Sequence, residues 1–326
     1  MKFKRNILVT GVGGGVGQGI YFALNKKKHN VFVSDSHEYA AGLYLTKNHF
    51  ITGNLEESDN FAKFIELIKT NRIDVVLPGN EYDVSTLSKS KSLLESITQA
   101  IVIVSPEKTI ELANDKWQSY EYFKNRDIST PKTYLVTNET NLENIFREID
   151  FPLIVKPRFG TASRGVVSAT SLAEAREFIA RTSNPLIQEK LIHLKQDILG
   201  SEYTCSVFKD SKGNFIGPIV ARRTLRNGTS WIVEVVSKPD LKDYLLKIAQ
   251  SLDYSGPLNI QLIETSSGPK LLEINCRFSG TTGIRSYFGF NEPEMSISSF
   301  YDKKSLKSVK LKEGTVLRYV QDIIVK

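Results

Sequence analysis

About the first hundred residues alternate short β-rich runs with segments of helical spacing, and this alternation is the strongest constraint on the fold. The β-rich runs are "NILVT" (6–10), "VFVSD" (31–35), "VVLP" (75–78) and "AIVIVS" (100–105). The helical segments between them are 16–27, 58–71 and 82–97. Strands that alternate with helices in this way favour a parallel, doubly wound sheet. The sequence therefore predicts an α/β unit at the N-terminus.

Two further units follow, and their patterns differ from the first. After a helical segment that begins at Pro106, a small α+β unit is predicted from a helix near 141–149, a strand that ends at Lys156, and a helix at about 172–181. Beyond "PLIQEKL" (185–191), longer β-rich runs dominate. We therefore expect a chain of α/β and α+β class with three domains. Their expected bounds are 1–110, 111–187 (with the linker helix) and 188–326.

Composition narrows the class of protein. The 326 residues are 40% hydrophobic and 24% charged, and no apolar run approaches the roughly 18 residues that span a bilayer. The net charge of +7 would suit nucleic acid or a site for phosphates and carboxylates, and no RNA-binding aromatic pattern is present. Cys205 and Cys276 lack metal-ligand spacing. We expect a cytoplasmic protein with small-molecule partners and no nucleic acid or membrane partner.

The stretch "KPRFGTASRGV" (156–166) directly follows the apolar run 151–155 and predicts a turn between two strands. Its two glycines allow backbone angles that other residues avoid, and its small side chains leave amides open to a close ligand. A lysine and two arginines surround these amides. The stretch is typical of an anion-binding loop, and the alternative is a solvated basic turn.

The run "LLEINCRFSG" (271–280) has the most specific pattern in the chain. In a strand, Glu273, Asn275 and Arg277 project from one face because side chains alternate. Oxygen ligands of this kind suit Mg²⁺, and an arginine beside them can hold a phosphate through two hydrogen bonds. Gln261 would add an oxygen if its strand pairs with this one. An exposed strand with a salt bridge is the alternative interpretation.

The N-terminal "VTGVGGGVGQG" raises a different hypothesis. It fits the TGxxGxxG pattern of short-chain dehydrogenases and nucleotide-sugar epimerases, and Asp35 ends the second strand, where such enzymes bind a ribose. Tyr120 and Lys124 supply a YxxxK pair. The strict GxGxxG spacing fails at Val16, and an NAD(P)-dependent enzyme would leave everything after residue 130 unexplained. A glycine-rich first turn also packs a helix close to a strand.

Taken together, the motifs resemble the ATP-grasp superfamily, in the branch related to the large subunit of carbamoyl-phosphate synthase. The resemblance covers essentially the whole chain, with the motifs in the family's order. They are "ILVTGVGGGVGQG", "LPGNEYDV", "NDKW", "LIVKPRFGTASRGV", "LIQEKL", "GSEYTCSVF", "NIQLIE" and "LLEINCRFSGTTG". The resemblance implies a pre-ATP-grasp domain with a doubly wound parallel sheet, followed by a two-part ATP-grasp fold.

The resemblance also implies roles for individual residues. Phosphate contacts fall to Lys116 and Lys156, and the flap over the phosphates to Ser163, Arg164 and Gly165. The adenine would lie against Gln188, Glu189, Lys190 and Leu191, and Glu202 would hold the ribose. The metal ligands would be Gln261, Glu273 and Asn275. Arg277 and Lys156 would act in catalysis, with Arg277 on the transferred phosphate.

The implied activity is an ATP-dependent ligase that uses Mg²⁺, with Mn²⁺ as an alternative metal. ATP would phosphorylate a small-molecule carboxylate, such as that of an amino acid, and an amine would attack the acyl phosphate to form an amide. Arg222 and Arg223 are candidates for binding this carboxylate, or they are surface charges, and Arg285 lies in the stretch that is the best candidate for the substrate wall. The resemblance leaves a homodimer open. A non-catalytic nucleotide-binding regulator on the same fold is a further alternative.

Overall fold

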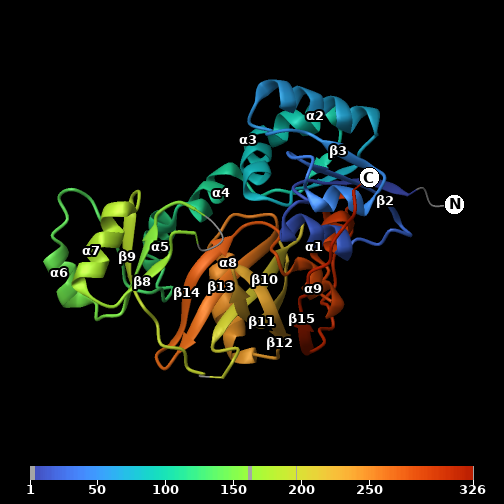
Figure 1. The fold of residues 1–326 in the computed structure, drawn as a ribbon. Helices are drawn as coiled ribbons and strands as arrows, with labels where there is room; N and C mark the ends of the chain where they lie inside the picture. The colour runs from blue at the N-terminus through green and yellow to red at the C-terminus, as the bar shows by residue number, and fades with distance from the viewer. Residues whose placement is uncertain (1–3, 161–163, 196, 326) are drawn as a thin grey trace.

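The computed structural model describes residues 4–160, 164–195 and 197–325 (Figure 1). Its N-terminal sheet is parallel throughout, with strand order β3-β2-β1-β4-β5. The strands are β1 (Arg5–Val9), β2 (His29–Asp35), β3 (His49–Ile51), β4 (Val75–Leu77) and β5 (Ile101–Val102). The helices are α1 (Gly15–Ala23), α2 (Ser58–Thr70) and α3 (Glu81–Thr98), with a 3-10 turn η1 (Ala41–Leu45). The expected doubly wound α/β unit is confirmed.

A small antiparallel sheet forms the far end of the molecule, away from the N-terminal sheet (Figure 1). Its order is β6-β9-β7-β8, from β6 (Thr133–Leu135), β7 (Leu153–Pro157), β8 (Val167–Ala169) and β9 (Pro185–Glu189). Helices α6 (Leu142–Glu148) and α7 (Leu172–Arg181) share a hydrophobic core with these strands. Helices α4 (Glu107–Asn114) and α5 (Lys116–Lys124) connect this unit to the N-terminal one.

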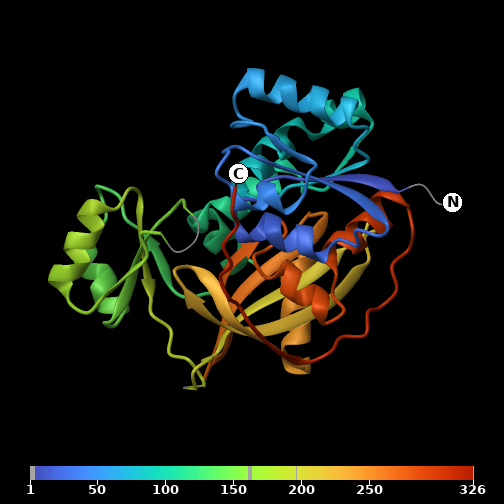
Figure 2. The same ribbon diagram turned by 45° about the vertical axis from the view of Figure 1, so that its right-hand side comes forward.

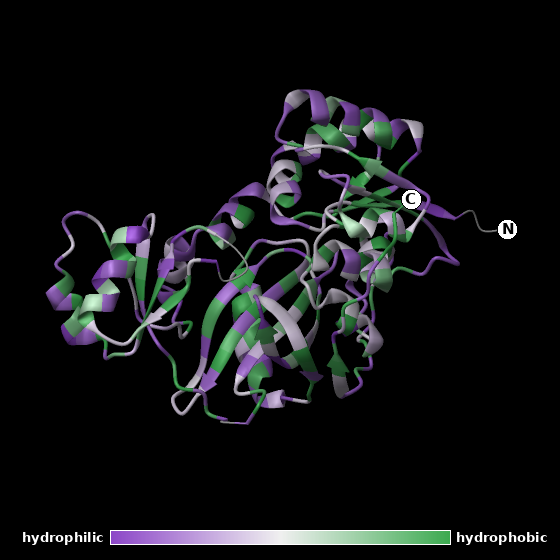
Figure 3. Ribbon diagram, in the orientation of Figure 1, coloured by the Kyte–Doolittle hydropathy of each residue, from purple (hydrophilic) through white to green (hydrophobic). Residues whose placement is uncertain are grey.

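The largest sheet is antiparallel and has the order β14-β13-β10-β11-β12-β15. Its strands are β10 (Glu202–Lys209), β11 (Phe215–Arg226), β12 (Thr229–Val235), β13 (Gly256–Thr265), β14 (Gly268–Asn275) and β15 (Gly314–Leu317). The accompanying helical segments are η2 (Pro239–Leu241), α8 (Lys242–Gln250), α9 (Thr282–Tyr287), α10 (Glu292–Ser296) and the π-helical η3 (Ile297–Tyr301). Hydrophobic and hydrophilic residues alternate along several of these strands (Figure 3), so one face packs on a core while the other carries polar groups.

Two glycines let the N-terminal unit approach the large sheet closely. Helix α1 packs against α9, which follows the large sheet's strand β14 (Figure 2). A Cβ atom added to Gly19 would lie 3.2 Å from the backbone nitrogen of Gly283, and one added to Gly283 would lie 3.0 Å from the Gly19 carbonyl oxygen. A larger residue at either position would therefore push α1 and α9 apart.

Asp115 interrupts what the sequence predicts as one helical segment after Pro106. Its extended backbone ends α4, and its Oδ1 accepts hydrogen bonds from the amides of Trp117 (3.0 Å) and Gln118 (3.1 Å) at the start of α5. The same carboxylate receives two hydrogen bonds from Arg158, of 2.8 and 2.6 Å. Asp115 thus caps α5 and ties it to the loop after β7.

Replacing Asp115 should separate these two contributions. Asp115→Asn keeps a capping oxygen but loses the charge that pairs with Arg158, whereas Asp115→Ala loses both. Loss of a cap costs about 0.5–2 kcal/mol. We therefore expect Asp115→Ala to lower the free energy of unfolding more than Asp115→Asn does, as measured by urea denaturation. Equal losses in the two variants would contradict the capping role.

Candidate active site

The basic loop lies between two antiparallel strands, as the sequence predicts. Strand β7 ends at Pro157, β8 begins at Val167, and both Gly160 (φ +129°) and Gly165 (φ +72°) have positive φ angles. Such angles strain residues with a side chain. Lys116, at the start of α5, donates from Nζ to the carbonyl oxygen of Gly160 (2.6 Å). The loop is therefore joined to the linker helices by a lysine as well as by Arg158.

A cavity of about 310 Å³, here called the first cavity, lies between the small sheet and the large sheet. Most of the residues expected to bind nucleotide or metal line it, although they come from separate helices, strands and loops. They are Lys116, Lys156, Arg164, Gln188, Glu189, Lys190, Leu191, Glu202, Gln261 and Glu273. Gly165 lies in the loop beside this cavity, and the expectation for Ser163 falls outside the described residues. The structure thus brings this group of sequence-predicted residues together.

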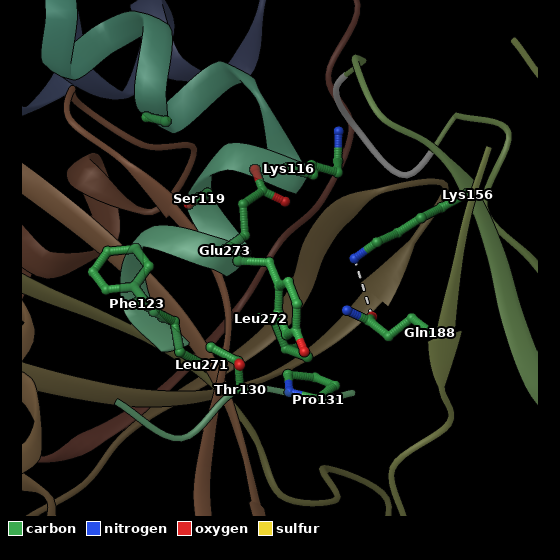
Figure 4. Close-up of a pocket in the computed structure, with 12 residues that line it drawn as sticks. Lys116, Ser119, Phe123, Thr130, Pro131, Lys156, Gln188, Leu271, Leu272 and Glu273 are labelled. Carbon is green, nitrogen blue, oxygen red and sulfur yellow. Dashed lines mark hydrogen bonds between the residues drawn. The ribbon is translucent and has the colours of Figure 1, made fainter. Parts of the chain in front are cut away.

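Lys156 is the most buried charged group in the first cavity. Its side chain crosses from β7 toward Gln188, and its Nζ donates to the Gln188 Oε1 atom at 3.0 Å (Figure 4). The amide of Gln188 donates in turn to Thr133 Oγ1 (2.9 Å), which fixes the amide's orientation. Burial lowers the pKa of Lys156 to about 8, while the negative charge of Glu273 opposes this change and the positive charge of Lys116 adds to it.

Lys116 faces the same carboxylate from the other side. Burial lowers the pKa of Lys116 as well, and Glu273 is the main charge that works in the opposite direction. Figure 4 shows Lys116 entering the site from α5 and Lys156 from the small sheet. Two lysines on different elements therefore share the field of one carboxylate, and a polyanion placed between them would satisfy both.

The expected metal ligands lie on neighbouring strands. Gln261 on β13 is paired directly with Glu273 on β14, and Asn275 follows two residues later on the same face. This gives one carboxylate and two amide oxygens, which are the donors that Mg²⁺ prefers, so the residues fit the ion. Asn275 donates to Glu273 Oε1 (3.0 Å). Among the described residues no group of three or more His, Cys, Asp or Glu side chains could hold a metal, so any site here depends on the amides.

Two arginines donate hydrogen bonds to the expected metal ligands. Arg223 on β11 donates to Glu202 Oε1 (2.9 and 2.7 Å) and to Gln261 Oε1 (2.7 Å). Arg277 donates to Asn275 Oδ1 (3.0 Å) and pairs with Glu81 at the start of α3. Arg223 therefore bridges the residue expected to hold a ribose and a residue expected to hold the metal. Arg277 links the end of β14, the strand of Glu273 and Asn275, to the N-terminal unit.

The other two candidate arginines lie elsewhere. Arg222 is 7% exposed, pairs with Glu234 (3.1 Å) and Asp197, and lies next to Arg223, so the alternation of the strand turns it to the opposite face. Arg285 is 1% exposed and pairs with Glu292 (3.1 Å). Neither is among the residues that line the first cavity or the second cavity described next, so the structure does not place them against a ligand.

A second cavity, also of about 310 Å³, adjoins the first. The two share Arg164, Arg223, Leu225, Gln261 and Glu273. The second cavity extends from β14 to Gly14 and Gly15 at the start of α1, and it includes Asn275, Arg277 and Arg318. Sequence reasoning missed Arg318 and Glu81. Glu81 lies inside the quoted "LPGNEYDV", but Arg318 stands in a segment without any recognisable motif.

The glycine-rich N-terminal turn gives little support to a dinucleotide site. Asp35 accepts a hydrogen bond from the backbone amide of Gly13 at 2.7 Å. The carboxylate that would bind a ribose under the dehydrogenase hypothesis therefore already has a partner in the glycine-rich turn. Tyr120 lines a small pocket together with Lys156 and Glu273. Lys124 Nζ lies 3.9 Å from Glu121 Oε1. In the YxxxK pair of the dehydrogenase hypothesis, Tyr120 therefore lines this pocket while Lys124 is exposed at the surface.

Two family models match the chain. Residues 7–102 match the PylC-like N-terminal domain, and residues 190–323 match the ATP-grasp domain of a biosynthetic pathway with the Ter operon. The first match covers the glycine-rich turn. The second confirms the ATP-grasp resemblance. No helix in the described part of the chain is both long and apolar enough to cross a membrane.

Curated relatives include two kinds of ligase. Phosphoribosylamine–glycine ligase of Methanosarcina barkeri is 25% identical over 96% of this chain and 77% of its own length. The carbamoyl phosphate synthase large chain of Helicobacter pylori is 25% identical over 87% of this chain, which spans only 28% of that larger protein. The expected relationship to the carbamoyl-phosphate synthase branch and to ATP-dependent ligases is confirmed.

Solved structures share the fold. N5-carboxyaminoimidazole synthetase of Staphylococcus aureus, complexed with ADP, has a TM-score of 0.77 at 19% identity and covers 98% of this chain and 83% of its own. The biotin carboxylase domain dimer of a Hydrogenobacter thermophilus carboxylase, complexed with MgADP, has a TM-score of 0.75 at 16% identity and covers 97% and 74%. The expected two-part ATP-grasp fold is confirmed, and the ADP and magnesium in these complexes agree with the expected ATP and Mg²⁺.

The lowered pKa of Lys156 predicts a pH dependence of nucleotide binding. Above about pH 8 the free protein loses the Lys156 proton, which a bound phosphate would require. The affinity for Mg·ADP should therefore be flat below pH 8 and should fall above it, by at most about tenfold per pH unit. Titration calorimetry from pH 7 to 9.5 measures this slope. Lys156→Met should bind more weakly with a shallower slope, and an unchanged slope would contradict the assignment.

Proposed function

We propose that this chain, which resembles the ATP-grasp ligases, forms an amide from a small-molecule carboxylate and an amine, with ATP converted to ADP and phosphate. The observation that carries this proposal is the convergence on one continuous space of two lysines, an oxygen donor set and two arginines. The first cavity would hold the nucleotide and the second cavity the acid. Their shared boundary at Gln261 and Glu273 would be the place of phosphoryl transfer.

The reaction would run in two steps. A carboxylate oxygen of the acid attacks the γ-phosphorus of ATP, the bond to the β-γ bridging oxygen breaks, and ADP leaves. The amine nitrogen then attacks the acyl carbon, inorganic phosphate leaves, and the amine loses a proton. Positioning and charge neutralisation account for the catalysis, so the chain needs no nucleophile of its own.

Each residue has a task that follows from its place. Lys116 and Lys156 would hold phosphate oxygens, and Arg164 and Gly165, together with Ser163, would close over them. Arg277 would neutralise the transferred phosphoryl group. Gln261, Glu273 and Asn275 would hold Mg²⁺, which would supply positive charge to the phosphates. Mn²⁺ has the same oxygen preference and could replace it.

The hinge between the two sheets would hold the base and the ribose. The adenine would lie against the segment of Gln188, Glu189, Lys190 and Leu191. Glu202 would hold the ribose hydroxyls once Arg223 gives up its hydrogen bonds to that carboxylate. Arg223 lines both cavities and would then contact the acid, whereas Arg222 and Arg285 keep their structural partners. The domain bounds 1–110, 111–187 and 188–326 belong to the same proposal.

The setting of the protein is also part of the proposal. Cys205 and Cys276 are free and buried, which suits a cytoplasmic protein with small-molecule partners and no nucleic acid or membrane. A homodimer is proposed because one structural neighbour, the biotin carboxylase domain, is described as a dimer, and sedimentation equilibrium would test it.

The test is ADP release from Mg·ATP, screened against pools of amino acids and other carboxylates with amine acceptors. Release that requires both an acid and an amine would support the ligase. ATP binding without acceptor-dependent release would favour the regulator, and binding of NAD(P)H in place of ATP would favour the dehydrogenase hypothesis.

Glu273→Ala should retain the fold and lose turnover. The change removes the only carboxylate in the donor set and the charge that faces both lysines, so we expect kcat to fall by at least roughly 10²–10³-fold. Circular dichroism and the same ADP assay measure the two effects. Glu177→Ala, which removes an exposed carboxylate from α7, is the matched control and should keep full activity. Full turnover by Glu273→Ala would contradict the metal assignment.

A further inference from the structure

The second cavity contains a positive charge that the reaction proposed above does not use. Arg318 follows β15, donates from its backbone amide to the Trp231 carbonyl oxygen (2.9 Å) and from Nη2 to the Gly280 carbonyl oxygen (2.7 Å). These contacts hold the guanidinium at the wall of the second cavity. Arg318 does not line the first cavity, so its charge is directed to the acid's space only.

Arg318 differs from its neighbours in its partners. Arg223 is paired with Glu202, and Arg277 is paired with Glu81. In the ranges that the structure describes, no acidic side chain forms an ion pair with Arg318. Burial lowers its pKa, and no charged neighbour counters this effect. A desolvated guanidinium without a counter-charge is costly unless an anion approaches it.

The start of α1 lies at the same wall. Gly14 and Gly15 line the second cavity, and a Cβ atom added to Gly15 would lie 3.4 Å from Arg318 Nη1. No side chain caps this helix, and its first turn contains no acidic residue. The first amides of a helix have no partner within it, and the helix dipole adds positive potential there. Two independent elements therefore favour an anion at one place.

We infer that Arg318 and the N-terminus of α1 bind a second anionic group of the acid substrate. This rests on the proposed function and narrows its substrate to acids with two anionic groups. One is the reacting carboxylate, beside Glu273 and Asn275, and the other is a carboxylate or phosphate at Arg318. Acids with an uncharged far end leave Arg318 without a counter-charge and bind weakly.

The experiment compares acids in matched pairs that differ in the charge of the far end. The pairs are L-glutamate with L-glutamine, succinate with butyrate, and 3-phosphoglycerate with glycerate. Each is titrated calorimetrically into the full chain, with and without Mg·ADP. We expect at least one dianionic member to bind more tightly than its partner by about 10- to 100-fold. The phosphate and carboxylate pairs distinguish the two sources of the anion.

Variants at residue 318 locate the effect. Arg318→Gln should weaken the dianionic acid about 10- to 100-fold and leave its uncharged-end partner and Mg·ADP within twofold. Arg318→Lys keeps the charge and should recover part of the affinity. Lys312→Gln removes the same charge from an exposed position nearby in the chain and should change nothing.

The outcomes separate this inference from the proposed function. Preference for the acid with an uncharged end, no binding by any dianionic acid, or unchanged affinity in Arg318→Gln overturns the inference, even where Mg·ADP binds normally. Failure of Mg·ADP to bind overturns the proposed function. The titrations without nucleotide then still decide whether Arg318 holds an anion.

Discussion

The candidate active site depends on the balance between two lysines, the buried Lys156 and the half-buried Lys116, and the carboxylate of Glu273 that both of them face. Lys116 and Lys156 come from different elements, and Glu273 is the main negative charge that both experience. Its position follows from the pairing of β13 with β14, which sets Glu273 opposite Gln261. Burial reduces the screening of all three charges, so their balance is sensitive to any anion that enters. In the proposed function, a triphosphate would bring negative charge to the two lysines and Mg²⁺ would bring positive charge to Glu273.

Arginines hold the rest of the site in register. Arg223 joins β11 to Glu202 and Gln261, and Arg277 joins β14 to Glu81 of the N-terminal unit. Because Arg277 links two units, the N-terminal domain takes part in shaping the second cavity, and the close contact of Gly19 with Gly283 holds α1 against α9.

The sequence predicted those parts of the site that are contiguous in the chain. The face shared by Glu273 and Asn275 follows from the period of a strand, and the basic loop follows from its glycines. The contact of Arg277 with Glu81 joins residues 196 positions apart, and no local sequence pattern predicts it. Arg318 was missed for the same reason, because its role arises where β15 meets the start of α1. The break at Asp115 had a local indication, since aspartate is a common N-cap, but the apolar spacing on both sides obscured it. For Arg222, strand alternation already implied that only one of two adjacent arginines could face the site.

The central claim is that the carboxylate is activated as an acyl phosphate between the two cavities. The most direct measurement uses the acid found in the screen, labelled with ¹⁸O in its carboxylate, and mass spectrometry of the phosphate released during turnover. The account predicts that each phosphate carries one ¹⁸O atom, because the carboxylate oxygen attacks phosphorus and leaves with it. Phosphate without the label, at undiminished amide formation, would contradict it.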